Sequence, residues 1–335
     1  MSAARASSTP DPARLLEVRD LAVSFATGDG IVQAVRGVSF AVERGRTLGI
    51  VGESGSGKSV SALTIVGLTQ GAQITGSARF EGRDLLGMSS DDLRAVRGAQ
   101  IAMIFQDPLS SLHPHYRVGW QIAEMIRVHE RASRGQARAR AVELLGLVGI
   151  PRPERRVDDY PHQFSGGMRQ RAMIAMALAL NPALLIADEP TTALDVTVQA
   201  QIMDLMRRVQ QEFGTAIILI THDLGLVAEI ADDVLVMYAG RAMEHAGRRT
   251  LFYDAHHPYT RGLLASLPVK GEASRRLTPI QGAPPSMIRL PGGCPFHPRC
   301  SEVLPRCPTD TPPLRELGPG HESACWLAPR TGGAA

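Results

Sequence analysis

The stretch Gly52-Glu-Ser-Gly-Ser-Gly-Lys-Ser59 is the part of this sequence that decides the fold. An apolar run, TLGIV, precedes it, and the residues VSALTIVGL after it carry apolar side chains at helical spacing. A glycine-rich turn between a buried strand and a helix matches the pattern G-x4-G-K-[ST], whose backbone N–H groups surround a phosphate. Lys58 and Lys270 are the two lysines of a chain that carries 36 lysines and arginines in total. A compact ammonium suits a phosphate loop better than a planar, forked guanidinium.

The pattern predicts a role for each part of this loop. The glycines let the backbone curl around a β-phosphate, Lys58 reaches the β- and γ-phosphates, and the Ser59 hydroxyl ligates Mg²⁺. The predicted nucleotide-binding residues are Gly52, Glu53, Ser54, Gly55, Ser56, Gly57, Lys58 and Ser59. We therefore expect ATP with Mg²⁺ as the ligand.

Composition limits the class of protein. The chain has 335 residues, 44% of them hydrophobic, and its net charge of +3 includes no long block of like charges, so general nucleic-acid affinity is not expected. Residues 1–13 lack the apolar core of a secretory signal and indicate a disordered tail. The longest apolar runs fall short of the roughly 20 residues that cross a bilayer. We expect a cytoplasmic protein that does not span the membrane by itself.

A second motif, NPALLIADEP, places two carboxylates directly after a buried apolar run. The ends of parallel strands meet at one edge of an open sheet, which is where such sheets bind ligands. There Asp188 would hold Mg²⁺ through water, and Glu189 would act as the general base on the attacking water. Taken alone, two acids after an apolar run are more often an ordinary strand end, and the phosphate loop is what favours the catalytic interpretation.

A third motif, QFSGGMRQR, puts Ser165, Gly166 and Gly167 at the start of a helix. Unpaired N–H groups and the positive end of the helix dipole make such a start suitable for a phosphate. The chain already has a phosphate loop. The second anion site is therefore expected to serve an ATP that is bound to another subunit.

Periodicity predicts an α/β fold built on a parallel sheet. The alternating stretches LLEVRDLAVSF and AVRGVSFAVE indicate an antiparallel β-subdomain. Helical spacing places Ile202, Leu205, Met206, Val209 and Phe213 on the buried face of one helix. The expected organisation is a disordered tail (1–13), a nucleotide-binding domain (14–266) with a helical subdomain at about 112–175, and an irregular extension (267–335).

All four cysteines lie in the extension, at Cys294, Cys300, Cys307 and Cys325. Disulfides are not expected in a cytosolic chain, so a cysteine cluster in a proline-rich segment indicates a metal site. The spacing lacks the close C-x2-4-C pairs of zinc sites, and four thiolates can instead hold an iron–sulfur cluster. Iron–sulfur, zinc and free thiols all stay open from the residues alone.

Together these motifs resemble the ATP-binding subunits of ABC transporters, from about Leu15 to the C-terminus. In that family the loop at residues 52–59 is the Walker A motif, Asp188 and Glu189 are Walker B, and residues 165–168 form the signature. The resemblance implies the following further roles: Gln106 as the Q-loop residue that also faces Mg²⁺, Ala193, Leu194 and Asp195 as the D-loop, and His222 as the switch histidine on the γ-phosphate. Phe25 matches the position that stacks on adenine, but a core position is an equal alternative.

The signature also resembles one subgroup of that family, the oligopeptide and dipeptide importers, in the chain that has SGGM in place of SGGQ. Phe164 and Met168 depart from the common LSGGQ signature, and His113 stands where the subgroup commonly has asparagine. The segments SLHPHYRVGWQI and HHPYTRGLLASLP look like the same subgroup, whose cysteine-containing extension in some members is thought to bind a [4Fe-4S] cluster. The resemblance implies an ATPase that powers peptide uptake.

The implied partners are two transmembrane permease subunits, a second and different ABC ATPase, and, indirectly, an extracytoplasmic solute-binding protein. No nucleic acid is implied. The implied location is the cytoplasmic face of the inner membrane, bound peripherally.

Three alternatives differ from peptide import. One is the same role in a nickel or glutathione importer. Another is a soluble ABC ATPase acting on DNA or ribosomes, although the chain lacks the long coiled coil and tandem nucleotide domains of such proteins. The last is a scaffold subunit that does not hydrolyse ATP, against which Glu189 and His222 argue.

Overall fold

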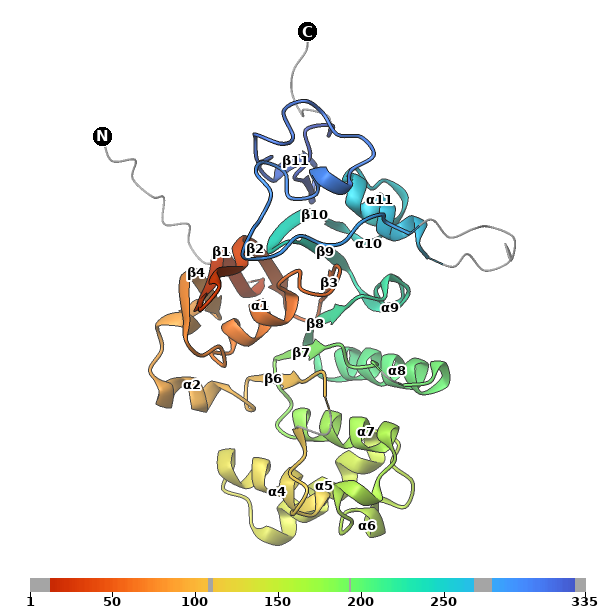
Figure 1. The fold of residues 1–335 in the computed structure, drawn as a ribbon. Coiled ribbons are helices and arrows are strands. Elements are labelled where there is room, and N and C mark those ends of the chain that lie inside the picture. Colours follow the sequence, from red (N-terminus) through yellow and green to blue (C-terminus); the bar gives the residue numbers. More distant parts are fainter. Residues whose placement is uncertain (1–12, 108–110, 193, 268–278, 329–335) are drawn as a thin grey trace.

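An eight-stranded sheet runs through the computed structural model, which describes residues 13–107, 111–192, 194–267 and 279–328. Its strand order is β11-β12-β10-β9-β3-β8-β7-β6 (Figure 1). The strands are β3 (Thr47–Val51), β6 (Ile101–Ile104), β7 (Leu184–Asp188), β8 (Ala216–Thr221), β9 (Asp233–Tyr238), β10 (Arg241–Gly247), β11 (Arg315–Gly318) and β12 (His321–Ser323). The α/β class expected from the sequence is confirmed.

The central strands β6, β7, β8, β3 and β9 are parallel neighbours. Residues of β3, β7 and β8 are all buried, as expected for strands that are covered on both faces. Alternate residues of β7 belong to different cores: Leu184 and Ile186 pack with helix α1 (Lys58–Ile65), whereas Leu185 and Ala187 pack with helix α8 (Val196–Phe213). The parallel arrangement brings the loops after β3, β6, β7 and β8 to the same edge of the sheet.

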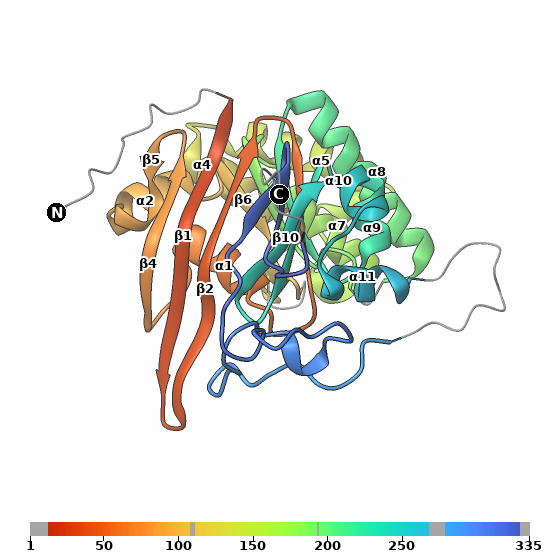
Figure 2. The same ribbon diagram turned by 90° about the horizontal axis from the view of Figure 1, so that it is seen from above.

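A separate antiparallel sheet has the order β2-β1-β4-β5. Its strands are β1 (Arg14–Thr27), β2 (Gly30–Glu43), β4 (Ala72–Phe80) and β5 (Arg83–Asp84). Figure 2 shows β1, β2 and β4 as long strands on the opposite side of the molecule from α8, α9 (Leu224–Ile230) and α10 (Arg248–Tyr253). This is the antiparallel subdomain that the alternating pattern predicts.

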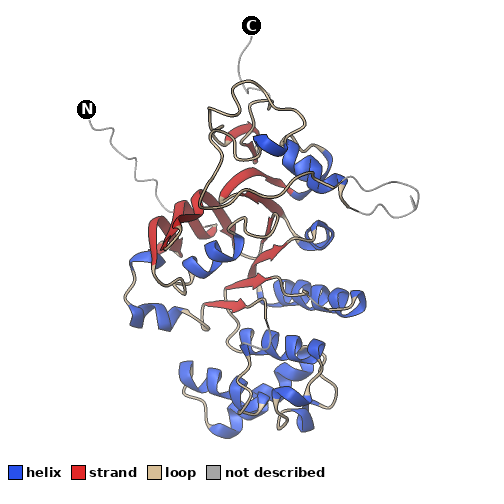
Figure 3. Ribbon diagram, in the orientation of Figure 1, coloured by secondary structure: helices blue, strands red, loops and turns tan. Residues whose placement is uncertain are grey.

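The helices fall into two groups. Four of them form an all-helical lobe at one end of the molecule (Figure 3): α4 (Val118–His129), α5 (Arg134–Leu147), α6 (Pro153–Arg156) and α7 (Gly166–Ala177). Among the described residues, the remaining helices are α1 (Lys58–Ile65), α2 (Ser90–Val96), α8 (Val196–Phe213), α9 (Leu224–Ile230), α10 (Arg248–Tyr253) and α11 (Pro258–Ala265), with short 3-10 turns η1 (Leu85–Gly87), η2 (Pro161–Gln163) and η3 (His297–Arg299).

Helix α8 corrects one residue of the predicted buried face. Ile202, Leu205, Met206 and Val209 are buried, but Phe213 is 44% exposed. Phe213 is the last helical residue before Gly214, which ends the helix in the left-handed region with φ of 65°. The hydrophobic core beside α8 ends near Val209, one turn before the helix ends at Phe213. The apolar pattern of the sequence therefore continues past the last buried residue.

The extension joins the main sheet. Its strands β11 and β12 pair with each other, and β12 pairs with β10. Cys294, Phe296 and Cys307 are buried in the same core as the parallel strands. The segment is otherwise irregular, and residues 268–278 of the predicted 267–335 region lie outside the described residues, as do residues 1–12 of the predicted tail.

Within the described ranges, none of the helices has the length and apolar character needed to cross a membrane.

Candidate functional site

The phosphate loop lies between β3 and α1 and depends on two glycines. Gly52 has φ of 151°, and a Cβ there would lie 2.1 Å from the Met237 carbonyl oxygen. Gly57 has φ of 97°, and a Cβ there would lie 2.3 Å from the Ala34 carbonyl oxygen. Both the left-handed backbone and the close approach exclude any larger residue. The glycine pattern of the sequence thus reflects packing of the loop against β2 and β9.

The Lys58 side chain lies inside the loop and is 5% exposed. Its ammonium donates to the carbonyl oxygens of Gly52 at 2.7 Å and Glu53 at 2.9 Å, and lies 3.3 Å from the Ser56 hydroxyl. Burial lowers the pKa of Lys58, and three nearby carboxylates offset part of that effect. The geometry provides a cation that can exchange loop carbonyls for phosphate oxygens.

Ser59 and Asp188 come together although 129 positions separate them: the Ser59 hydroxyl donates to Oδ1 of Asp188 at 2.9 Å. Burial raises the pKa of Asp188, while the bond from Ser59 acts in the opposite direction. A buried carboxylate beside a hydroxyl is a set of hard oxygen ligands that fits Mg²⁺, and a bound cation would favour the ionised form. Ser59 and Asp188 thus lie together at the position where the sequence predicts Mg²⁺.

Glu189 is the centre of a hydrogen-bonded group. Its Oε2 accepts from Gln106 Nε2 at 3.2 Å and from the Thr192 hydroxyl at 2.8 Å. Its Oε1 lies 3.2 Å from Nδ1 of His222. Glu189 itself has φ of 47°, an unusual conformation for a residue other than glycine. Gln106, Glu189 and His222 follow strands β6, β7 and β8 in turn, so the parallel sheet assembles three residues that the sequence analysis singled out.

The surroundings of Glu189 suit an ionised carboxylate. Burial by itself raises the pKa of Glu189, but the hydrogen bonds from Thr192 and His222 outweigh it and the pKa lies below its ordinary value. The charged form is therefore present at neutral pH and can accept a hydrogen bond from water. The His222 side chain is 64% exposed, so it can turn towards an incoming phosphate without disturbing the buried core.

The signature residues lie in another part of the molecule. Ser165 is the N-cap of α7 and accepts from the backbone N–H of Met168 at 3.3 Å. Ser165 and Gly166 are exposed, and α7 belongs to the helical lobe, away from the end of α1 that carries Lys58 (Figure 1). The structure therefore does not bring the predicted signature residues Ser165, Gly166 and Gly167 to the phosphate loop of the same chain.

The three departures from the related sequences have local explanations. Phe164 is 2% exposed and Met168 is partly buried, and both pack in the hydrophobic core that the helical lobe shares with the parallel sheet. His113 Nδ1 accepts from the backbone N–H of His115 at 3.3 Å. In the common Asx turn, the side-chain oxygen of asparagine accepts from the backbone N–H two residues later. His113 makes the equivalent contact through Nδ1, so histidine can replace asparagine here.

The D-loop and adenine positions are placed in part. Asp195 is the N-cap of α8 and accepts from the N–H of Val198 at 2.9 Å, and Leu194 packs against the core. Ala193 lies outside the described residues. Phe25 lies in β1 and is half-buried against the core of the antiparallel subdomain, which leaves part of its ring accessible.

Sequence reasoning missed several residues that hold this site. Gln170, buried on α7, donates to the carbonyl of Pro190 after Walker B at 2.5 Å. The Tyr259 hydroxyl accepts from the N–H of Glu53 at 2.9 Å, and the Arg299 guanidinium pairs with the Glu53 carboxylate. Gln170 stands in the quoted SGGMRQR segment, but no pattern could connect position 299 to position 53.

The four cysteines surround one small pocket. Cys294, Cys300, Cys307 and Cys325 all line it, together with the aromatic rings of Phe296 and Trp326. Burial raises the pKa of Cys294 to about 11, and the other three thiols add to that effect. No three of these sulfurs lie within 4.8 Å of one another.

Backbone N–H groups point at each cysteine sulfur. The N–H groups of Glu302, Leu304 and Leu327 donate at 3.4 Å to the sulfurs of Cys300, Cys307 and Cys325 respectively. Cys294 receives the N–H of Phe296. Such donors stabilise thiolates, which are the ligand form of cysteine. The donor set fits a cationic metal centre.

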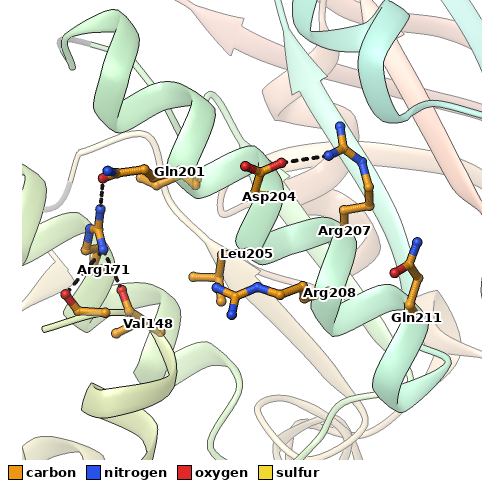
Figure 4. Close-up of a pocket in the computed structure, with 10 residues that line it drawn as sticks. Val148, Arg171, Gln201, Asp204, Leu205, Arg207, Arg208 and Gln211 are labelled. Atoms are coloured by element: carbon orange, nitrogen blue, oxygen red, sulfur yellow. Dashed lines mark hydrogen bonds and ion pairs between the residues drawn. The ribbon is translucent and has the colours of Figure 1, made fainter.

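A different hollow, of about 440 Å³, lies beside α7 and α8 and contains no phosphate-loop residue (Figure 4). Arg171 reaches across it from α7 to Gln201 on α8, and also donates to the Val148 carbonyl at 2.9 Å. This arginine therefore links the helical lobe to α8, the helix that begins after Asp195.

Two family models match the chain. The model described as "ABC transporter" matches residues 35–192, and that described as "Oligopeptide/dipeptide transporter, C-terminal region" matches residues 243–307. The chain is 52% identical over 323 residues to the oligopeptide transport ATP-binding protein OppD of Salmonella typhimurium, covering 96% of each. It is 49% identical over 317 residues to the dipeptide transport ATP-binding protein DppD of Bacillus subtilis, covering 94% of this chain and 95% of the relative.

Among solved structures, the chain is similar to the dimeric post-hydrolysis state of the ATP-binding cassette MJ0796 bound to ADP and Pi. That similarity has a TM-score of 0.64 at 27% identity, and it covers 70% of this chain and 99% of the other. A second dimeric MJ0796 structure gives the same TM-score at 28% identity.

Proposed function

This chain belongs to the ATP-binding subunits of ABC transporters, in the oligopeptide and dipeptide importer group, and on that premise we propose how its residues divide the work. It is the ATP-hydrolysing subunit of a peptide importer. The nickel, glutathione, soluble-ATPase and scaffold alternatives are set aside, because relatives over nearly the whole chain are named for peptide transport.

The observation that best supports ATP hydrolysis at this site is the hydrogen-bonded group around Glu189. ATP binds with its β- and γ-phosphates in the loop at residues 52–59, where Lys58 exchanges its loop carbonyls for phosphate oxygens. Ser59 and Asp188 would hold Mg²⁺, with Gln106 facing the same site, and the bound ion would supply positive charge against the phosphates. Glu189 orients and deprotonates the attacking water for in-line displacement of ADP. His222 leaves Glu189 to contact the γ-phosphate, and Phe25 stacks on the adenine.

The signature of one chain serves the nucleotide of another. Ser165 and Gly166 are exposed at a helix N-terminus that lies away from the phosphate loop of its own chain, so an ATP bound to a partner is the substrate they can reach. The dimeric MJ0796 structures support such pairing. We take the partner to be a second, different ABC ATPase, as the SGGM signature favours, with Asp195 at the boundary between the two chains.

Coupling to the permeases is assigned to an apolar groove of about 230 Å³ between the Q-loop and the helical lobe. Four methionines, Met103, Met125, Met173 and Met176, line it with Phe105, which directly precedes the Q-loop glutamine. Flexible methionines suit a helix laid into a groove. The occupant is a cytoplasmic helix of a transmembrane permease, which places this chain peripherally on the cytoplasmic face of the membrane, with the solute-binding protein on the other side.

Replacing Met125 with aspartate is expected to abolish co-purification of the two permeases from gently solubilised membranes, because it buries a charge in the groove. ATP binding by the variant should be unchanged. Val128→Asp is the matched control, since Val128 lies on the same helix and is 68% exposed. Mass spectrometry of tagged chains measures the stoichiometry and also identifies the second ATPase. Full recovery of the permeases with Met125→Asp would contradict the docking site.

We assign a [4Fe-4S] cluster to the four cysteines. A single zinc ion bound at about 2.3 Å by each thiolate would bring the four sulfurs to within about 4 Å of one another, whereas no three of these sulfurs form a group as close as 4.8 Å. A larger cluster does not need so tight a group of sulfurs, and the N–H donors and aromatic side chains around the cysteines suit it. Its role is to fix the extension against the core, in which Cys294 and Cys307 are buried.

Anaerobically purified chain is expected to contain about four iron and four acid-labile sulfide per molecule. Cys307→Ser should lower the iron content to below half and lower the melting temperature, with Ser301→Ala as the neighbouring surface control. Metal analysis and thermal melts measure both. Stoichiometric zinc without sulfide, or metal-free thiols, would overturn the assignment while leaving the ATPase role intact.

A further inference from the structure

Arg299 connects the cysteine-bearing extension to the phosphate loop. It lies next to Cys300, and its guanidinium forms a two-pronged ion pair with the Glu53 carboxylate, at 2.6 Å from Nη1 and 3.0 Å from Nη2. The two residues are 246 positions apart. Glu53 is the second residue of the phosphate loop and takes part in no step of hydrolysis described above. The pair therefore requires an explanation of its own.

All five guanidinium N–H groups of Arg299 donate hydrogen bonds to neighbouring acceptors. Besides the two bonds to Glu53, Nη1 donates to the Tyr238 hydroxyl at 3.2 Å. Nη2 and Nε donate to the carbonyl oxygens of Ile280 at 3.4 Å and Gln281 at 2.9 Å. The guanidinium carbon also lies 5.7 Å from the centre of the Tyr238 ring. A fully satisfied guanidinium fork is a built site, and lysine cannot reproduce it.

Glu53 is held from three sides. Its carboxylate meets Arg299, its N–H donates to the Tyr259 hydroxyl at 2.9 Å, and its carbonyl accepts from Lys58 at 2.9 Å. Both members of the ion pair are largely shielded, with side chains 5% exposed for Arg299 and 25% for Glu53. Water therefore screens the Glu53 charge weakly, and an unpaired carboxylate here would repel the phosphates that bind to the same loop.

We propose that Arg299 is a positioning residue for ATP binding: it neutralises Glu53 and fixes the first turn of the phosphate loop, so that the extension sets the affinity of the site for ATP. The inference rests on ATP binding at residues 52–59, and it does not require any metal at the cysteines. It gives the extension a function at the nucleotide site in addition to its place in the sheet.

The test is the dissociation constant for ATP of the full-length chain, together with KM and kcat of the purified importer. Arg299→Met is expected to raise Kd and KM about tenfold and to leave kcat within about twofold, because the charge acts on binding. Arg289→Met is the matched control, since Arg289 is exposed on the same extension and its loss should leave all three constants unchanged.

The double variant Glu53→Gln/Arg299→Met separates this role from a purely structural one. Removing the carboxylate as well should restore Kd to within about threefold of the native value. Arg299→Lys keeps the positive charge but loses the two-pronged geometry, so its Kd for ATP should lie between those of the native chain and Arg299→Met. If Arg299→Met does not fold, the Kd of Arg299→Lys tests the proposal in its place. A native Kd in Arg299→Lys and Arg299→Met, or a double variant as weak as the single one, would overturn the proposal. If the native chain itself did not bind ATP, the assignment of residues 52–59 as the phosphate loop would be overturned instead.

Discussion

ATP hydrolysis by the Glu189→Gln importer is expected to fall by about a hundredfold or more at this site, while ATP binding stays at the native level. Glutamine keeps the shape and can still accept from Gln106 and Thr192, but it cannot take a proton from water. The Glu189 carboxylate is already ionised at neutral pH, because its hydrogen bonds hold its pKa below the ordinary value. Phosphate release in single-turnover conditions and equilibrium binding of ATP measure the two effects separately.

Glu212→Gln is the control for this change. Glu212 is exposed on α8, so the same substitution there should leave hydrolysis and binding unchanged. Full turnover by Glu189→Gln at this site would remove Glu189 from the role of general base. A loss of binding equal to the loss of turnover would assign it a role in holding the nucleotide instead.

Lys58→Ala is expected to weaken ATP binding about a hundredfold or more and to remove hydrolysis with it. Charge-assisted hydrogen bonds contribute about 1.5–3 kcal/mol each, so losing contacts to two phosphates costs about 3 kcal/mol or more. The change also leaves the carbonyls of Gly52 and Glu53 without their donor, which loosens the empty loop. Titration with a fluorescent ATP analogue measures the affinity.

The other lysine provides the control for that experiment, because Lys270→Ala removes the same charge from the chain. Its ATP affinity should equal that of the native protein. If Lys58→Ala bound ATP with native affinity, the loop at residues 52–59 would not be the phosphate site.

The sequence predicts those parts of the site that lie at the ends of elements with strong patterns. The strand, loop and helix around Lys58 follow from glycine spacing and apolar runs, and Asp188 follows from the end of a continuous buried strand. Because parallel strands end at one edge, the meeting of Gln106, Glu189 and His222 also follows once the sheet is assumed. Their roles in turnover stay predictions.

Contacts between distant segments could not be predicted. The Arg299–Glu53 pair depends on how an irregular, proline-rich segment packs across β9, and such a segment has no period from which a register can be derived. Strands β11 and β12 are too short for alternation to be visible, so their addition to the main sheet was missed. Phe213 was misplaced because helical periodicity does not show where the neighbouring core ends.

Peptide import driven by Glu189-dependent ATP hydrolysis is tested most directly by peptide uptake into proteoliposomes that contain the co-purified importer and its solute-binding protein. A labelled oligopeptide is expected to accumulate with ATP and Mg²⁺ on the side of the ATPase subunits, and accumulation should cease with Glu189→Gln. ATP hydrolysis without peptide accumulation, or uptake that is undiminished in Glu189→Gln, would contradict it.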